Sequence, residues 1–410
     1  MQRDICFDIS AWLVSATLDG VAEQEILRGF CERLGGAGIP LAEANLLIDT
    51  LHPIYEGRVF RWRRGESELL PVVEYGRTGD GGENDERWRT SPFFRLLETG
   101  ETMLRRGLEA GAGQEFPVHR DFAERGMSEY LAFVHRFGAE GTIGEMDCIY
   151  SSWITDRPGG FSEEQVSMMS ELGPSLAAAL KSASQTRITR TLVETYLGRD
   201  TGRRVLAGKI ARGVTEKISA VLWFSDLRGF TRTTETCDPD AIIPFLNDYS
   251  DAVITAIHGA GGEVLKLIGD GTLAIFDARD PASGCARALA AYATLKETVP
   301  GLSEERRKVR LPVTSPYVGL HIGEVFYGNV GSEERLDFTV VGPAVNETSR
   351  IAAMCRSAER DVLVSTAFRA AASPREQAGL VSVGRYALRG VARPQELFTI
   401  DAQADRAAAS

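Results

Sequence analysis

Two aspartates in the second half of the chain stand where apolar runs end. Residues 218–224 form a β-rich apolar run that stops just before Asp226. Asp270 lies in a Gly-Asp-Gly turn between two further apolar runs, residues 262–268 and 272–276. This pattern predicts a β-hairpin, because glycine supplies the positive φ values of tight turns. If the hairpin lies beside the first strand, the two carboxylates converge.

Converging carboxylates are suited to binding divalent cations. Mg²⁺ prefers oxygen ligands, and a backbone carbonyl such as that of Leu227 can supply a further one. Two carboxylates can hold two cations about 3.5–4 Å apart, an arrangement suited to phosphoryl transfer with a pyrophosphate leaving group. Either aspartate alone would be interpreted as an ordinary turn residue. The pair predicts a metal site at Asp226, Leu227 and Asp270 that takes Mg²⁺ or Mn²⁺.

Three separated segments resemble the signature segments of class III adenylate and guanylate cyclases. They are residues 224–231, 263–271 and 337–350, in the order and at the spacing typical of that family. The resemblance covers roughly residues 217–400. It implies an α+β, ferredoxin-like catalytic domain that works as a homodimer, with active sites between the subunits and two metal ions in each. It also implies that Asp226 and Asp270 are the metal-binding carboxylates.

The same resemblance assigns residues to recognition of the base. Lys266 matches the base-selecting lysine, and Thr339 falls at the partner position, where adenylate cyclases carry Asp or Thr and guanylate cyclases commonly carry Glu and Cys as the pair. A lysine can donate to N1 of adenine and a threonine hydroxyl can accept from the 6-amino group, whereas guanine presents a carbonyl and a protonated N1. Unpaired buried polar groups disfavour the wrong base on the order of 10²-fold. We therefore expect ATP as the substrate and cyclic AMP as the product.

The last matching segment supplies two polar residues for the reaction itself. A helix is expected over residues 344–356, because a proline at its start fits a first helical turn. Asn346 and Arg350 are four residues apart and share one face, which on its own would be an exposed polar surface. The resemblance implies that Asn346 orients the ribose and that Arg350 contacts the phosphates. Residues 386–391 resemble the family's closing strand, where Arg389 can touch the polyphosphate or lie on the surface.

Other functions fit the sequence less well. Guanylate cyclase activity is disfavoured by Lys266 and Thr339, and a catalytically silent nucleotide-binding or dimerisation module by the complete set of matching positions. A diguanylate cyclase would need a GGDEF-like turn. The five histidines lack zinc-ligand spacing. The Gly-rich residues 319–331 lack the order of a phosphate-binding P-loop and are expected to form two strands with a tight connection.

The first part of the chain is expected to be an α+β domain. A helical pattern covers residues 9–34. Strand-like runs follow at residues 44–51, 56–64, 69–75, 129–137 and 146–155. Strands that lead into a terminal helix, above all residues 153–165, resemble a GAF-like sensory domain, assigned to residues 1–162. An unrelated α+β regulatory module is the alternative, and an unidentified small molecule or other signal is the expected input.

A helical segment is expected to join the two domains. Apolar residues recur at helical spacing from residue 163 to about 197, and Pro174 is expected to kink the helix or end its first part. We interpret residues 163–213 as a dimerising linker that passes a signal to a catalytic domain at 214–400; a helix packed on its own domain is the alternative. The pattern breaks at residues 198–204. Residues 401–410 are expected to be a disordered tail.

Composition limits the partners and the compartment. The net charge of -11 over 410 residues argues against nucleic acid as a partner. The chain has no run of about 18 uncharged apolar residues, so no membrane span is predicted, and its first residues lack a secretory signal. Six cysteines without metal-ligand spacing indicate a reducing compartment. Together these observations predict a cytoplasmic protein.

Overall fold

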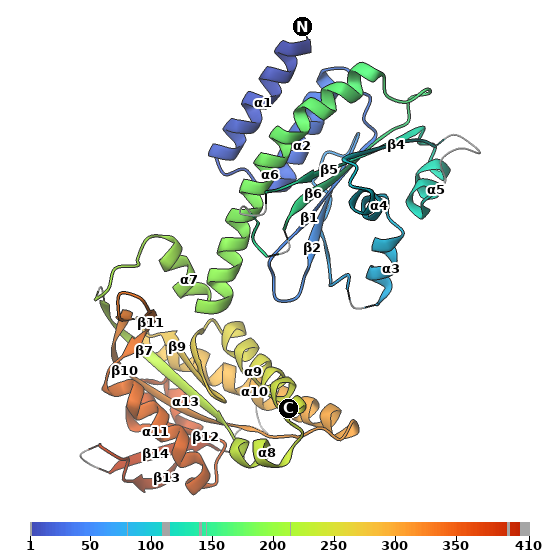
Figure 1. Cartoon of the computed structure of the whole chain (residues 1–410). Coiled ribbons are helices and arrows are strands. Elements are labelled where there is room, and N and C mark those ends of the chain that lie inside the picture. The colour runs from blue at the N-terminus through green and yellow to red at the C-terminus, as the bar shows by residue number, and fades with distance from the viewer. Residues whose placement is uncertain are drawn as a thin grey trace. The chain divides into compact units, whose positions relative to one another are not determined.

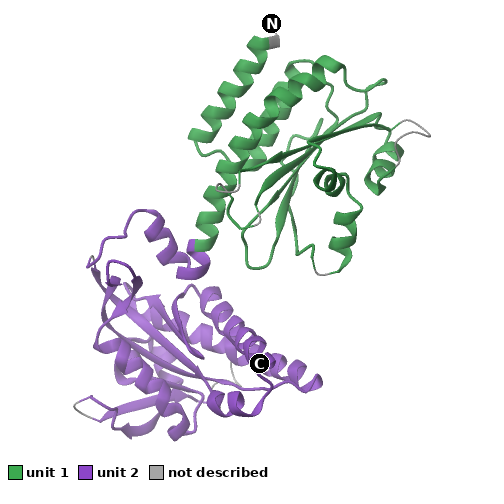
Figure 2. Ribbon diagram, in the orientation of Figure 1, with its two compact units in different colours: residues 1–192 green, residues 193–410 purple. Residues whose placement is uncertain are grey.

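The computed structural model describes residues 2–79, 81–108, 115–138, 142–144, 146–213, 215–391 and 394–401. The chain forms two compact units, residues 1–192 and 193–410 (Figures 1 and 2). The expected tail at residues 401–410 lies outside the described residues except for its first member. In the described part of the chain, no helix is both long and apolar enough to cross a membrane.

The N-terminal unit is built on an antiparallel sheet that has six strands within its described residues, in the order β3-β2-β1-β6-β5-β4. The strands are β1 (Glu43–Asp49), β2 (Gly57–Arg63), β3 (Val73–Tyr75), β4 (Met103–Gly107), β5 (Glu129–Arg136) and β6 (Cys148–Thr155). Strand β6 is buried along its whole length, because helices cover both faces of the sheet (Figure 1). The alternation of side chains along β5 therefore supplies two separate cores.

Long helices lie on one face of this sheet and short helices on the other. Helices α1 (Gln2–Leu18), α2 (Glu23–Gly36) and α6 (Glu163–Leu197) pack with Leu131 and Phe133 of β5. The opposite face is covered by α3 (Glu83–Arg89), α4 (Pro92–Thr99) and α5 (Pro117–Glu124). Tyr130 and Ala132 of β5 contribute to the core on that side.

The sequence predicted most of these strands but not the short helices α3, α4 and α5. The long helices differ from the prediction in two ways. The single helical pattern of residues 9–34 is two helices, because Gly20 adopts a φ of 69° in the turn between α1 and α2. Pro174 does not end α6, which is continuous across it. Leu172 and Leu176 are both buried in the core, and this packing offsets the backbone hydrogen bond that a proline removes.

The C-terminal unit contains, in its described residues, an eight-stranded sheet in the order β13-β14-β12-β10-β7-β9-β8, with β11 paired to β10. The strands are β7 (Thr215–Leu227), β8 (Glu263–Ile268), β9 (Gly271–Asp277), β10 (Pro316–Gly331), β11 (Leu336–Val341), β12 (Val362–Ser365), β13 (Leu380–Tyr386) and β14 (Gln395–Ile400). Helix α9 (Ile242–Gly259) joins β7 to β8, and α10 (Pro281–Lys308) joins β9 to β10. This βαββαβ order, in which the adjacent strands of the series β10-β7-β9-β8 are antiparallel to one another, is the ferredoxin-like arrangement.

Alternate residues of β7 pack into cores on opposite faces of this sheet. Val221 and Trp223 pack with α9 and α10. Ala220 and Leu222 belong to the other core, with Ala344 of helix α11 (Pro343–Ala358). The remaining elements are α8 (Phe230–Thr236), the 3₁₀ turn η2 (Pro239–Ala241), α12 (Thr366–Ala371) and α13 (Pro374–Ala378).

The prediction of two strands within residues 319–331 is wrong. Strand β10 runs unbroken, because it pairs with β7 from Pro316 to Gly328. The expected close backbone approach does occur: a Cβ at Gly319 would lie 2.5 Å from the backbone nitrogen of Ala352 in α11. Glycine at position 319 therefore allows α11 to pack directly against β10.

Residues 198–204, expected to interrupt the helical pattern, include the start of another helix, α7 (Arg199–Leu206). This helix packs on the sheet of the C-terminal unit. The hydroxyl of Tyr327 donates to Asp200 at 3.0 Å, and Arg204 donates to the same carboxylate at 2.7 Å. A Cβ at Gly198 would lie 2.7 Å from the carbonyl oxygen of Val264, so α7 is held closely against β8 and β10.

Candidate active site

The structure brings the two predicted carboxylates together. Asp226 is the penultimate residue of β7, and Asp270 lies in the tight turn between β8 and β9. The β7–β9 ladder pairs Ser225 with Thr272, so its continuation places Leu227 opposite Asp270. The Leu227 N–H donates to Oδ2 of Asp270 at 3.2 Å. The Asp270 side chain thus replaces the next backbone acceptor of the ladder and is fixed beside β7.

The charges of this pair are poorly compensated. The pKa of Asp226 is raised to about 6, because burial penalises the charged form and because the Asp270 carboxyl is a hydrogen-bonded neighbour of like charge; the Leu227 N–H partly opposes the shift. Among the side chains that the structure describes, no lysine, arginine or histidine forms an ion pair with either aspartate. A bound cation would supply the missing positive charge.

The donor set fits a hard divalent cation. In an antiparallel ladder, the N–H and C=O of a residue lie on the same edge of the strand, so the Leu227 carbonyl faces the same side as its N–H, toward Asp270. Carboxylate and carbonyl oxygens are ligands that suit Mg²⁺ and Mn²⁺. No group of three or more His, Cys, Asp or Glu side chains placed for a metal occurs in the described ranges. Further ligands would have to be water or phosphate oxygens, as is usual for Mg²⁺.

Lys266 has a partner that the sequence did not reveal. Its ammonium group forms an ion pair with Asp337 of β11, and both side chains are 43% exposed. Thr339, also on β11, is two residues from Asp337 and therefore on the same side of the strand. The structure thus places Lys266 and Thr339 at one region of the sheet, through the pairing of β11 with β10. In the sequence, the indication of this arrangement was the two-residue spacing of Asp337 and Thr339, which places both side chains on one side of a strand.

The remaining predicted residues form a second group. Asn346 is exposed and Arg350 partly buried, both on α11. Arg389 is exposed and does not lie on the expected strand, because β13 ends at Tyr386 and the chain turns through Gly390 at a φ of 74°. A Cβ at Gly390 would lie 3.4 Å from a terminal nitrogen of Arg350. The Arg350 guanidinium therefore lies against the loop that carries Arg389.

The two groups of predicted residues differ in charge. No hydrogen bond or ion pair of the described side chains joins Asn346, Arg350 or Arg389 to Asp226 or Asp270. One group holds paired carboxylates and the lysine that can read a base. The other presents guanidinium groups, which match phosphate oxygens in charge and geometry.

The C-terminal unit matches a known catalytic domain in sequence. Residues 214–402 match the family model for the adenylate and guanylate cyclase catalytic domain. An adenylate cyclase of Anabaena cylindrica is 38% identical over 146 residues, which are 35% of this chain and 28% of that protein. The chain thus spans little more than a quarter of the length of that relative. The sequence similarity to this catalytic domain thus covers most of the C-terminal unit, residues 214–402.

Solved structures resemble the same part of the chain. The adenylyl cyclase CyaB from P. aeruginosa is 23% identical, with a TM-score of 0.42, covering 46% of this chain and 96% of that one. The guanylyl cyclase Cya2 is 26% identical, with a TM-score of 0.40, covering 45% and 93%. These proteins are named for different nucleotides. The family match begins at residue 214, so the GAF-like interpretation of the N-terminal unit stays a prediction.

Proposed function

We propose that this protein is an adenylate cyclase, a phosphorus–oxygen lyase that converts ATP to 3′,5′-cyclic AMP and pyrophosphate. The observation that carries the proposal is the meeting of Asp226 and Asp270 at the end of β7, without a cationic side chain beside them among the described residues. The catalytic-domain match and the similarity to an adenylate cyclase support it.

Asp226, Asp270 and the Leu227 carbonyl would hold two Mg²⁺ or Mn²⁺ ions, which supply charge neutralisation at the triphosphate and a lowered pKa of the attacking hydroxyl. The chain's own contribution is to fix the ligands. The Leu227 N–H orients the Asp270 carboxylate, and β7 places Asp226 next to it.

The reaction requires positioning rather than a protein nucleophile. The ribose 3′-oxygen bonds to the α-phosphorus, the bond from that phosphorus to the β-phosphate oxygen breaks, the hydroxyl proton passes to solvent and pyrophosphate leaves. Asn346 orients the ribose. Arg350 and Arg389 hold phosphate oxygens as negative charge develops, which is the point where fixed guanidinium groups accelerate such a step.

Lys266 and Thr339 select adenine. Lys266 donates to N1, and the Thr339 hydroxyl accepts from the 6-amino group. Asp337 holds the Lys266 ammonium before the base arrives, so less side-chain entropy is lost when the base binds.

The enzyme works as a homodimer in this proposal. Asp226, Asp270, Lys266 and Thr339 act from one copy, while Asn346 and Arg350 come from a second copy. The resemblance to class III cyclases, whose active sites lie between subunits, supports the arrangement. A symmetric dimer then has two equivalent sites.

The N-terminal unit acts as a GAF-like sensory domain whose input is an unidentified small molecule or other signal. Its antiparallel sheet with helices on both faces supports this role. Residues 163–213 serve as the dimerising linker, supported by the continuous helix α6.

A competition assay tests the proposal. The purified full chain is given equal concentrations of ATP and GTP with Mg²⁺ or Mn²⁺, and cyclic AMP, cyclic GMP and pyrophosphate are quantified. We expect cyclic AMP with equimolar pyrophosphate. Cyclic GMP alone would establish the guanylate cyclase alternative. No cyclic nucleotide with either metal, from the full chain and from a fragment that lacks the N-terminal unit, would contradict cyclase activity.

A double substitution tests the assignment of base selection. Lys266→Glu with Thr339→Cys removes the donor to N1 and the acceptor for the 6-amino group. The ratio of kcat/KM for ATP to that for GTP should fall on the order of 10²-fold. An unchanged ratio would mean that other residues select the base.

A further inference from the structure

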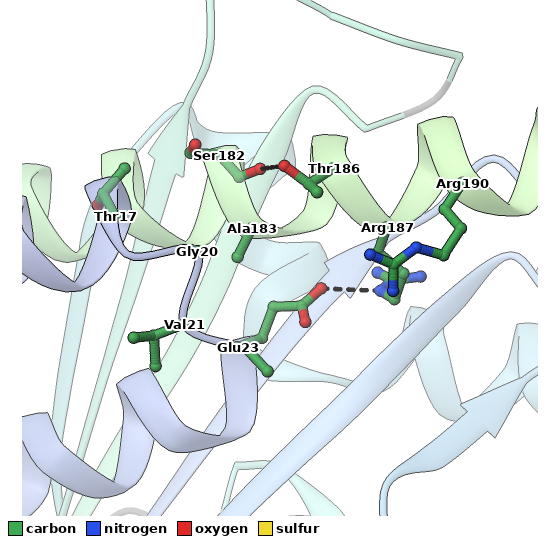
Figure 3. Close-up of a pocket in the computed structure, with 10 residues that line it drawn as sticks. Thr17, Gly20, Val21, Glu23, Ser182, Ala183, Thr186, Arg187 and Arg190 are labelled. Carbon is green, nitrogen blue, oxygen red and sulfur yellow. Dashed lines mark hydrogen bonds and ion pairs between the residues drawn. The ribbon is translucent and has the colours of Figure 1, made fainter. Parts of the chain in front are cut away.

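A cavity of about 190 Å³ lies in the N-terminal unit between the α1–α2 turn and helix α6 (Figure 3). Residues 20–22 of the turn form one wall, and Arg187 and Arg190 of α6 form part of the other. Val21 and Ala183 contribute apolar surface. The cavity therefore combines a short apolar wall with cationic side chains.

A buried carboxylate sits at the cavity and engages one of the arginines. Glu23 is 5% exposed and accepts from Arg187 Nε at 2.8 Å and from Ser184 Oγ at 2.9 Å. Arg187 also donates through Nη1 to Thr50 at 3.1 Å. Its Nη2 is buried and has no hydrogen-bond partner among the described residues. A buried donor in this state is unfavourable until an acceptor reaches it.

Arg190 adds a second, uncompensated charge. It lies three residues after Arg187, on the same face of α6, and both side chains extend from α6 on the side of Glu23 (Figure 3). In the part of the chain that the structure describes, Arg190 has no hydrogen-bond or ion-pair partner. Two guanidinium groups and one carboxylate leave the cavity with an excess positive charge.

Two threonine hydroxyls of the lining already donate within their own helices. Thr17 donates to the carbonyl of Leu13 at 2.7 Å, and Thr186 donates to the carbonyl of Ser182 at 3.0 Å. The charged donors of the cavity that lack an acceptor are guanidinium N–H groups, whose fork matches a carboxylate or phosphate.

We propose that this cavity binds a small oxyanion, a carboxylate or phosphate group, through Arg187 and Arg190. The volume is below the roughly 300–1,000 Å³ typical of sites for drug-sized ligands, so the ligand is a small metabolite or anion. The apolar wall leaves room for a short hydrocarbon body. The proposal concerns the N-terminal unit alone and does not depend on the cyclase reaction.

Binding to the full chain tests the proposal directly. Butyrate, inorganic phosphate and uncharged butanol are titrated at matched ionic strength, with chloride as the reference salt, by calorimetry and by melting temperature. We expect saturable binding of butyrate. If phosphate binds as tightly as butyrate, the arginines that contact the oxyanion account for the affinity. If phosphate binds more weakly, the apolar wall contributes to the affinity as well. Both results support the site. Butanol binding equal to butyrate would overturn it.

Variants locate the site. Arg190→Gln, which changes an exposed side chain, should weaken butyrate binding about tenfold or more, because a charge-assisted pair is lost. Arg120→Gln, an exposed arginine of α5, is the matched control and should bind as the unmodified chain does. Glu23→Gln should tighten binding severalfold, since it removes the carboxylate that competes for Arg187. Equal affinity in Arg190→Gln and Arg120→Gln, or looser binding in a folded Glu23→Gln, would refute the assignment.

Discussion

Glu23 in the N-terminal unit is buried and Asp226 in the C-terminal unit is partly buried, and the two carboxylates are compensated differently. Glu23 accepts hydrogen bonds from Arg187 and Ser184. Asp226 has a second carboxyl, that of Asp270, as its neighbour, and its pKa rises to about 6 because of burial and that neighbour. The first carboxylate is neutralised within the chain, whereas the second lies in a pair that a cation from solution could neutralise.

This difference separates a structural from a functional use of buried charge. Removing one partner of a buried ion pair destabilises a fold, because it leaves the other charge unpaired. Removing one member of a like-charged pair relieves repulsion and destroys a ligand site instead. The same kind of substitution should therefore have opposite effects in the two units.

The largest expected effect is on catalysis. Asp226→Asn should lower cyclic AMP formation at least about 10³-fold, because the metal-binding charge is lost while the fold is kept. Production of cyclic AMP is measured with Mg²⁺ and with Mn²⁺. Asp277→Asn, an aspartate on neighbouring β9 that pairs with Arg279, is the control and should remain active. Activity within tenfold of the unmodified chain would contradict the metal assignment.

The next effect is on stability of the N-terminal unit. Glu23→Ala should lower the free energy of unfolding by about 3 kcal/mol, because Arg187 is left buried without its carboxylate. For a unit of this size the melting temperature should fall by about 6–12 °C. Glu25→Ala breaks only a surface pair with Arg28 and should cost about 0–1 kcal/mol. Equal losses in the two variants would show that burial of Glu23 is not what matters.

Addition of a divalent metal should raise the stability of the C-terminal unit. At a ten- to hundredfold excess over its Kd, Mg²⁺ or Mn²⁺ should stabilise the protein by about 1.4–2.7 kcal/mol, since it binds the folded state alone. Melting curves at neutral pH record the shift without requiring turnover. The shift should vanish in Asp226→Asn. A shift of the same size in that variant would place the bound metal elsewhere.

The smallest effect concerns pH in the presence of a chelator. The folded-state pKa of Asp226, about 6, exceeds the ordinary value of 3.8, so the folded state holds this proton more tightly than the unfolded state does. The resulting stabilisation is complete below about pH 4 and is lost as pH rises to 6. Asp226→Asn should therefore gain stability relative to the unmodified chain across that window, by on the order of 1 kcal/mol after allowing for solvent screening. A stability difference between Asp226→Asn and the unmodified chain that does not change with pH would contradict the raised pKa of Asp226.

The sequence was informative where local patterns determine structure. Strands β1, β5 and β7 follow apolar runs, and the glycines around Asp270 define the hairpin that brings it to Asp226. Helix α3 was missed because its residues are mostly charged and none is buried. Arg389 was placed on a strand because residues 386–391 resemble the closing strand of the cyclase family, although Gly390 makes the chain turn.

Local sequence patterns could not predict contacts between segments that are far apart in the chain. Lys266 and Asp337 are 71 residues apart, and their pairing depends on how β11 is added to the sheet. Glu23 and Arg187 are 164 residues apart, and no local periodicity connects a helix start with the middle of another helix. The residues of the candidate active site were nevertheless predicted as one set, because the family resemblance supplies the long-range information that a single sequence lacks.

The docking of α7 has a practical consequence for truncation. Tyr327 is 3% exposed and its hydroxyl donates a hydrogen bond to Asp200, while Asn329 donates to the carbonyl of Lys209 at 2.9 Å. An expression fragment that starts at Gly213 would strip these contacts away and expose the aromatic ring to water. A fragment that begins before Gly198 keeps α7 and its contacts with the sheet, and is therefore the appropriate one for studying the C-terminal unit in isolation.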